Sequence, residues 1–250
     1  MRAAMRVEAL KLVRSPVGVI STAAIAGGIV VLVAALMAAT SSGDPAMIAK
    51  LGGSATFDWT GLLNTAAQIT GAAGLIGFGV VLAWLFAREF ADGTITGLFA
   101  LPIGRGTIAA AKLAIYTVWA VSVSLLIAAA LLLLGLVLGF GMPDASAWAG
   151  LGRQLSLGIL TAAIALPVAW VATASRSLLA GVSCAIALLI VAQVGAITGA
   201  GGWMPLAAPA LWAISGGAAV SGAQLALPAI LAAVVGAGTI VTWRRLQLDR

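Results

Sequence analysis

The chain has 250 residues, of which 62% are hydrophobic and only 8% are charged, and its mean hydropathy is +1.17. Soluble domains carry about 25% charged residues, so this composition excludes a water-soluble fold. The net charge of +6 does not indicate a nucleic-acid binder, because the basic residues lie at the ends of apolar runs and form no patch. Histidine is absent and Cys184 is the only cysteine, which excludes disulfide frameworks, zinc sites and histidine-based triads.

The first apolar run covers residues 17–39 and follows Arg2, Arg6, Lys11 and Arg14. A cleaved signal peptide has an apolar core of about 7–15 residues, so this run is too long to be one. At 1.5 Å per residue it reaches about 34 Å, enough to cross a hydrocarbon layer of about 30 Å. We therefore interpret it as a retained membrane span.

Five further apolar runs have spanning length. They cover residues 61–86, 113–138, 155–174, 178–198 and 223–243. Each is expected to be helical, because a bilayer offers no water to backbone amides and carbonyls. The fourth and fifth are separated only by Ser175, Arg176 and Ser177, which predicts a tight helical hairpin, and Pro167 is expected to kink the fourth. The predicted fold class is all-α, a six-span membrane protein that forms one domain, 1–250.

The positions of lysine and arginine predict the orientation of these spans. With the N-terminus inside, only Lys50 and Arg153 lie outside. The cytoplasmic set is Arg2, Arg6, Lys11, Arg14, Arg88, Arg105, Lys112, Arg176, Arg244, Arg245 and Arg250. This bias is typical of cytoplasmic loops and places both termini in the cytoplasm.

The external segment 199–222 carries no charge and contains Trp203, Pro205, Pro209 and Trp212. It is too apolar for a solvated loop, so we expect a re-entrant or interfacial segment anchored by tryptophan.

Ionisable residues at membrane depth usually mark proton relays, and here all charged residues lie in or beside the predicted loops and ends. This argues against a proton-driven carrier. An intramembrane protease is also not expected, because the sequence has neither a Ser-His pair nor an H-E-x-x-H motif. We expect no enzyme activity, no metal site and no cofactor bound by this chain.

Uncharged polar residues occur within the spans at Asn64, Gln68 and Gln193, and Gln224 begins the sixth. Such residues either form hydrogen bonds between helices or line a substrate path. The glycine pairs Gly135/Gly139 and Gly195/Gly199 have the spacing of close helix packing.

The predicted loop 87–112 has charges at both ends and an amphipathic middle. Pro102 ends its helix before a new helix begins near Thr107. We expect Glu89 and Asp92 to lie near the start of the loop's helix, where carboxylates suit the helix dipole. The residues alone fit a solvated loop and a docking site for a partner equally well.

A resemblance favours docking. The order E-x-x-x-G-T, a short apolar stretch, P-[IV]-x-R and a later lysine resembles the cytoplasmic loop between spans two and three of ABC-2 type transporter permeases. The matching residues are Glu89, Gly93, Thr94, Leu98, Pro102, Arg105 and Lys112, and we expect these residues together with Asp92 to couple the chain to an ATPase. The segment 1–16, with Glu8, Lys11 and Arg14, resembles the amphipathic helix that precedes span one in the same family. Gly104 departs from the pattern, where serine or threonine is commoner.

This resemblance implies a permease subunit of an ATP-driven exporter in a bacterial cytoplasmic membrane. Separate ABC ATPase subunits would bind ATP and Mg and dock on a coupling helix within 87–112. A second permease copy and membrane lipid are the other implied partners. A hydrophobic or amphipathic substrate would pass between two copies, with Asn64, Gln68 and Gln193 beside the path. The alternatives are an uncoupled transporter or channel, and a membrane immunity or scaffold protein without transport.

Overall fold

The computed structural model describes residues 1–42, 56–100 and 102–247, and this part of the chain contains helices and no strand. Six helical segments are long and apolar enough to cross a membrane. They are α2 (Pro16–Ser41), α4–η1–α5 (Trp59–Ala91), α7 (Arg105–Val137), α8–α9 (Ala145–Ser175), α10 (Leu178–Ile197) and α12 (Gly222–Arg245). The predicted fold class and the six spans are therefore confirmed.

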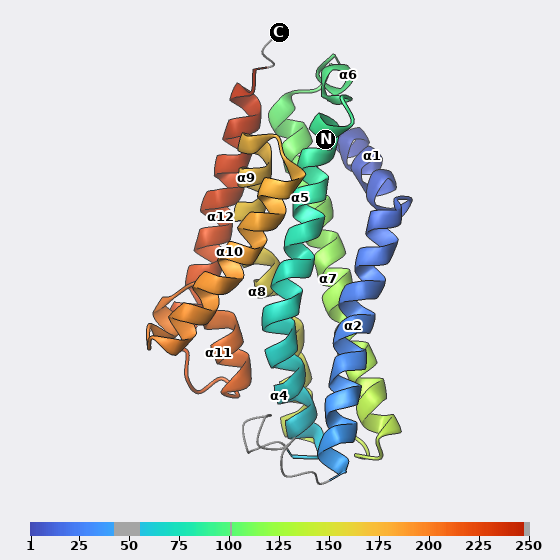
Figure 1. Cartoon of the computed structure of the whole chain (residues 1–250), viewed down its shortest axis with the longest axis vertical. Coiled ribbons are helices and arrows are strands. Elements are labelled where there is room, and N and C mark those ends of the chain that lie inside the picture. Colours follow the sequence, from blue (N-terminus) through green and yellow to red (C-terminus); the bar gives the residue numbers. More distant parts are fainter. Residues whose placement is uncertain (43–55, 101, 248–250) are drawn as a thin grey trace.

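The helices run up and down the long axis of one bundle (Figure 1). The short helices α1 (Arg2–Val13) and α6 (Ile95–Phe99) lie at the end where α12 finishes, which we call the terminal end. The opposite end carries the starts of α4 and α8 together with α11 (Ala208–Ile214). Lys50, predicted to be external, lies outside the described residues.

Polar residues begin most of the long helices by capping free backbone N–H groups. Ser15, Asp58, Asp144 and Ser177 each accept a hydrogen bond from the amide three residues ahead. Ser221 begins α12 through a reciprocal capping box with Gln224. The side chain of Gln224 is thus used at a helix start.

Two spans are interrupted. The fourth divides into α8 (Ala145–Ile164) and α9 (Pro167–Ser175), as Pro167 predicted. The second changes from α4 (Trp59–Ile69) to a π-helical turn, η1 (Thr70–Gly74), before α5 (Leu75–Ala91). Thr70 in this turn is fully buried and accepts a hydrogen bond from Nε2 of Gln154 in α8 at 2.7 Å.

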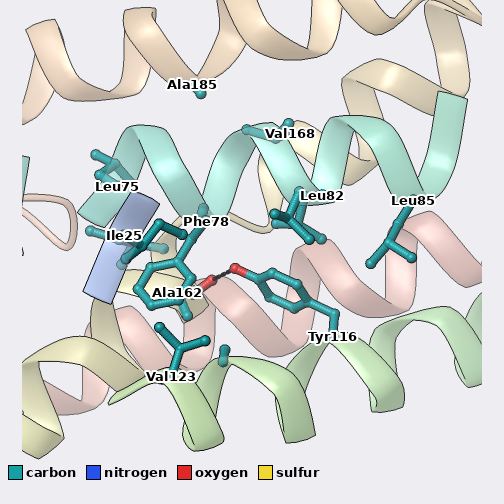
Figure 2. Close-up of a cluster of buried hydrophobic side chains, with 14 of the residues drawn as sticks. Ile25, Leu75, Phe78, Leu82, Leu85, Tyr116, Val123, Ala162, Val168 and Ala185 are labelled. Atoms are coloured by element: carbon teal, nitrogen blue, oxygen red, sulfur yellow. Dashed lines mark hydrogen bonds between the residues drawn. The ribbon is translucent and has the colours of Figure 1, made fainter. Parts of the chain in front are cut away.

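The core forms around α5, whose side chains Phe78, Leu82 and Leu85 are almost completely buried (Figure 2). Tyr116 of α7 lies within this layer and donates a hydrogen bond to the carbonyl of Ala162 in α8 at 2.9 Å. In a regular helix the carbonyl of Ala162 would accept a hydrogen bond from the amide of Leu166, which lies just before the break at Pro167. The phenol thereby satisfies its polar atom inside an apolar core.

Close packing of α5 on α10 depends on small residues that differ from the predicted pairs. A Cβ on Gly79 would lie 2.5 Å from Cβ of Ala185, and one on Gly181 would lie 2.7 Å from Cβ of Ala83. By contrast, Gly139 and Gly199 have positive φ and follow the ends of α7 and α10. Gly135 and Gly195 do allow close contacts, with Trp59 of α4 and with Met204, but Gly139 and Gly199 end their helices, so the pairs do not act as paired packing motifs.

Segment 199–222 contains the 3-10 turn η2 (Gly201–Trp203) and α11. The buried Ala213 of α11 packs in a small apolar cluster with Ala67 of α4 and Leu157 of α8.

Candidate coupling site and polar pockets

Four charged side chains from three helices meet at the terminal end of the bundle. Glu8 and Lys11 come from α1, Glu89 from α5, and Lys112 from α7. We call them the four-charge cluster. Two carboxylates and two ammonium groups make it neutral, which is the condition under which charges are tolerated in an apolar interior.

Lys112 is the centre of this cluster and its side chain is 0% exposed. Its Nζ donates to Oε1 of Glu89 at 2.7 Å, to Oε2 of Glu8 at 3.0 Å and to the carbonyl of Leu85 at 2.8 Å. These three bonds use all three ammonium donors. Oε2 of Glu89 is buried and has no hydrogen-bond partner among the described residues.

Lys11 completes the cluster from its more exposed side. Its Nζ lies 2.9 Å from Oε1 of Glu8 and 3.1 Å from Oε1 of Glu89. Partial burial acts to lower the pKa of Lys11, but the bonds and charges of Glu8 and Glu89 outweigh it and raise that pKa above its ordinary value. Lys11 therefore stays protonated and joins α1 to α5.

Three sequence-based expectations about these charges are wrong. Lys112 lies two turns inside α7, not in a loop, because α7 begins at Arg105. Glu89 and Asp92 lie at the end of α5, not at a helix start, since α5 ends at Ala91 with Asp92 as its C-cap. Glu89 and Lys112 are buried within spanning helices, so charge is not confined to loops and helix ends exposed to water.

The segment between α5 and α7 presents an exposed surface. Asp92, Gly93, Thr94 and Pro102 are exposed, and Leu98 is half-buried against the core. Gly93 has φ of +67°, a left-handed conformation that glycine adopts without strain, and it turns the chain from α5 into α6. Of the eight residues predicted to couple to an ATPase, the exposed ones are Asp92, Gly93, Thr94 and Pro102.

Trp243 of α12 supports this segment from beneath. The indole is fully buried and lies edge-on to Phe86 and Phe99, with centroids 6.0 and 6.2 Å apart. Its Nε1 donates to Oγ1 of Thr173 at 3.0 Å, and Nζ of Lys112 lies 5.9 Å from its centroid. The end of α12 is thereby joined to α6, to α9 and to the four-charge cluster.

Arg105 fixes the return of the segment into α7. Its guanidinium lies 4.3 Å from the ring centroid of Phe99 and donates to the carbonyl of Leu246 just after α12. The aliphatic part of Arg244 packs directly against Gly106, because a Cβ at this position would lie only 2.7 Å from Cγ of that arginine. Arg105 therefore acts within the chain.

The N-terminal helix α1 buries Ala4, Glu8 and Leu12, which recur every four residues and face the bundle. Glu8 and Lys11 belong to the four-charge cluster, whereas Arg14, the C-cap of α1, is exposed. The structure thus brings together two segments, 1–16 and 87–112, that the sequence presented separately.

The three residues predicted to line the substrate path fall into two places. Gln68 and Gln193 are exposed and line one pocket of about 220 Å³ between α4, α10 and α11. Their side-chain amides have no hydrogen bond within the described part of the chain. Asn64 instead lines a second pocket, of about 230 Å³, between α4 and α8.

Sequence reasoning did not identify Trp243, Gln154 or Thr70 as parts of these sites. Trp243 precedes Arg244 and Arg245, a pattern of interfacial anchors, yet it is buried. One signal was present for Lys112, because it stands between Ala109–Ala111 and Leu113. A lysine in such an apolar context needs a counter-charge, and the acidic residues predicted on that side were Glu8, Glu89, Asp92 and Asp249.

In a comparison with known families, residues 4–194 match the family described as ABC-2 family transporter protein. The match covers most of the chain, including the four-charge cluster, the segment 87–112 and the walls that α4 gives to both pockets. A comparison with curated protein sequences finds no match.

Proposed function

The chain belongs to the ABC-2 family of transporter membrane proteins, and we propose that it is the permease subunit of an ATP-driven exporter. A separate ABC ATPase would dock on the segment between α5 and α7 and would bind ATP and Mg. ATP hydrolysis would then take place entirely on that partner. This chain would convert closure of the ATPase subunits into movement of its own spans.

The observation that supports this proposal most strongly is the way in which buried contacts hold the helix ends on both sides of α6. Its neighbours Asp92, Thr94 and Pro102 are exposed, whereas the helix ends on either side are held by the four-charge cluster and by Trp243. A push on an exposed segment is transmitted only if its supports are rigid. Lys112, whose three ammonium donors are all used, and the edge-on aromatic contacts of Trp243 provide such supports.

We place the terminal end in the cytoplasm of a bacterial cell, as the distribution of charge favours. Among the described residues, the basic side chains outside the terminal end are limited to Arg153 of α8. Positive charge next to membrane spans is retained on the cytoplasmic side. An ATPase in the cytoplasm would then meet α6 directly.

We further propose that two copies pair and that the substrate is hydrophobic or amphipathic. The pocket with Gln68 and Gln193 has otherwise apolar walls from Leu189, Leu206 and Leu211. Gln68 lies about 14 Å from the start of a span about 50 Å long, which places it about 4 Å inside a hydrocarbon layer of about 30 Å centred on that span. A second copy or a polar substrate group would supply hydrogen bonds to its amide at this level.

The docking proposal is tested by Gly97→Trp. A Cβ on Gly97 meets no atom within 4 Å, so the new side chain would project from α6 without disturbing this chain. The chain is purified with a tag from its native cells in mild detergent, and ABC ATPases are detected by mass spectrometry. We expect an ATPase with the parent chain and at least tenfold less with Gly97→Trp.

The matched control is Gly152→Trp, because Gly152 is also open but lies on α8 at the opposite end. It should retain the ATPase. Absence of any ABC ATPase from the parent preparation would favour an uncoupled transporter, a channel or a scaffold instead. Equal loss in both variants would show that α6 is not the docking surface.

A further inference from the structure

A second polar pocket lies at the opposite end of the bundle, away from the proposed coupling site. It opens between the starts of α4 and α8, with Ala213 of α11 as a third wall, and has a volume of about 230 Å³. Its polar lining includes Trp59, Asn64, Arg153 and Gln154. Asn64 was the one member expected beside a substrate path.

Gln154 is built into this pocket with an unused hydrogen-bond acceptor. The residue is 3% exposed, and its Nε2 is fixed by the bond to Thr70 in the π-helical turn. Its Oε1 is buried and has no partner among the described residues. Because an unpaired buried carbonyl oxygen is costly, a ligand that brings a donor would be favoured here.

The pocket also contains unused donors. The Nε1 of Trp59 is buried without a partner among the described residues, while the ring of Trp59 packs over Gly135. Arg153 is half-buried and has no carboxylate within 4.0 Å in the part of the chain that the structure describes. The carboxylates of Asp58 and Asp144 cap α4 and α8 through the amides of Gly61 and Ala147, both at 2.8 Å.

The depth of Arg153 matches the region where lipid head groups meet hydrocarbon. The span Ala145–Ser175 has 31 residues and is about 46 Å long, about 16 Å longer than a hydrocarbon layer of about 30 Å. If this excess is divided equally between the two ends of the span, roughly the first 8 Å lie outside the hydrocarbon layer. Arg153, about 12 Å from the helix start, then lies about 4 Å inside the boundary of that layer. An arginine at that level pairs well with a phosphate.

We propose that this pocket binds a phosphate group that carries a neighbouring hydroxyl or ammonium donor, as phospholipid head groups do. The phosphate oxygens accept from the guanidinium of Arg153 and the indole N–H of Trp59. The hydroxyl or ammonium group donates to Oε1 of Gln154. This site is separate from the proposed docking of an ATPase and from the pocket of Gln68 and Gln193, so it stands or falls independently of them.

The test is binding of short-chain phosphatidylethanolamine, phosphatidylcholine and glycerol phosphate to the delipidated full chain, measured by native mass spectrometry in an uncharged detergent. We expect phosphatidylethanolamine to bind more tightly than phosphatidylcholine, whose quaternary ammonium has no N–H to donate. Arg153→Gln should weaken binding of phosphatidylethanolamine about tenfold. Arg6→Gln makes the same change of charge on an exposed residue of α1 and should leave binding unchanged.

Two further variants separate the parts of the site. Gln154→Leu should remove the preference for ethanolamine over choline, and Thr60→Trp should block the pocket by filling its exposed rim. Tight binding of glycerol phosphate would identify a free solute as the source of the phosphate, whereas binding of the lipid alone would identify the membrane. Arg153→Gln and Thr60→Trp variants that elute as folded protein and bind the lipids as the parent does would overturn the proposal.

Discussion

At the scale of single residues, the four-charge cluster shows how a strongly apolar chain retains buried charge. Each ion loses several kcal/mol of hydration when it is buried, and only its partners offset this loss. Lys112 offsets its lost hydration free energy through hydrogen bonds to two carboxylates and one carbonyl. The cluster therefore holds α1, α5 and α7 in one arrangement only while all four charges are present.

Lys112→Met tests this dependence. The substitution leaves Glu8 and Glu89 with only Lys11 between them, and breaking a buried pair in this way costs about 3–5 kcal/mol. We expect a clear fall in the Tm measured by thermal unfolding in detergent. The double variant Lys112→Met/Glu89→Met should lose less stability than the sum of the two single variants, because it removes both members of one pair.

The control for this cycle is the ion pair of half-buried Arg88 and exposed Asp92, whose atoms Nε and Oδ2 are 3.6 Å apart. Arg88→Met should change the unfolding free energy by less than about 1 kcal/mol. If Lys112→Met were as mild as Arg88→Met and its effect simply added to that of Glu89→Met, the cluster would not support the terminal end.

At the scale of elements, the number and order of the spans could be predicted because six long apolar runs leave the backbone no alternative to helix in a membrane. The extent of the spans could not, since hydropathy marks only the apolar centre of a span: the helix predicted to begin near Thr107 and the apolar run from residue 113 form one continuous helix, α7, from Arg105 to Val137. The contact of Lys11 with Glu89 joins residues 78 positions apart, and no local pattern reveals such a contact.

The packing of α5 on α10 gives a prediction at this scale. Gly181→Ala places a methyl group 2.7 Å from Cβ of Ala83, so the helices must separate, and overpacking of this kind costs about 1–3 kcal/mol. Gly27→Ala on α2 meets no atom within 4 Å and should stabilise the helix by about 0.5–1 kcal/mol. Thermal unfolding of the two variants should therefore shift Tm in opposite directions, and equal shifts would contradict the close approach of α5 and α10.

At the scale of the whole molecule, the spans divide into an inner and an outer group. Within their most apolar windows, Trp59–Ala91 and Ala145–Ser175 are 56% and 50% buried, whereas Leu178–Ile197 and Gly222–Arg245 are each 17% buried. The outer group therefore presents apolar surface to lipid or to a second copy of the chain. α6 lies at the terminal end and α11 lies toward the opposite end (Figure 1). The four-charge cluster belongs to the terminal end, whereas both polar pockets have walls from α4 and α11.

Site-specific cross-linking in native membranes tests the proposed ATPase coupling most directly. Thr96 is exposed on α6, and Gly152 is exposed on α8 at the opposite end. Each is changed to cysteine in a Cys184→Ala background. A short cross-linker is then added, one end of which reacts with the new thiol and the other with a nearby lysine. The account predicts a cross-link from Thr96→Cys to an ABC ATPase and none from Gly152→Cys. A cross-link to the ATPase from Gly152→Cys, with none from Thr96→Cys, would contradict it.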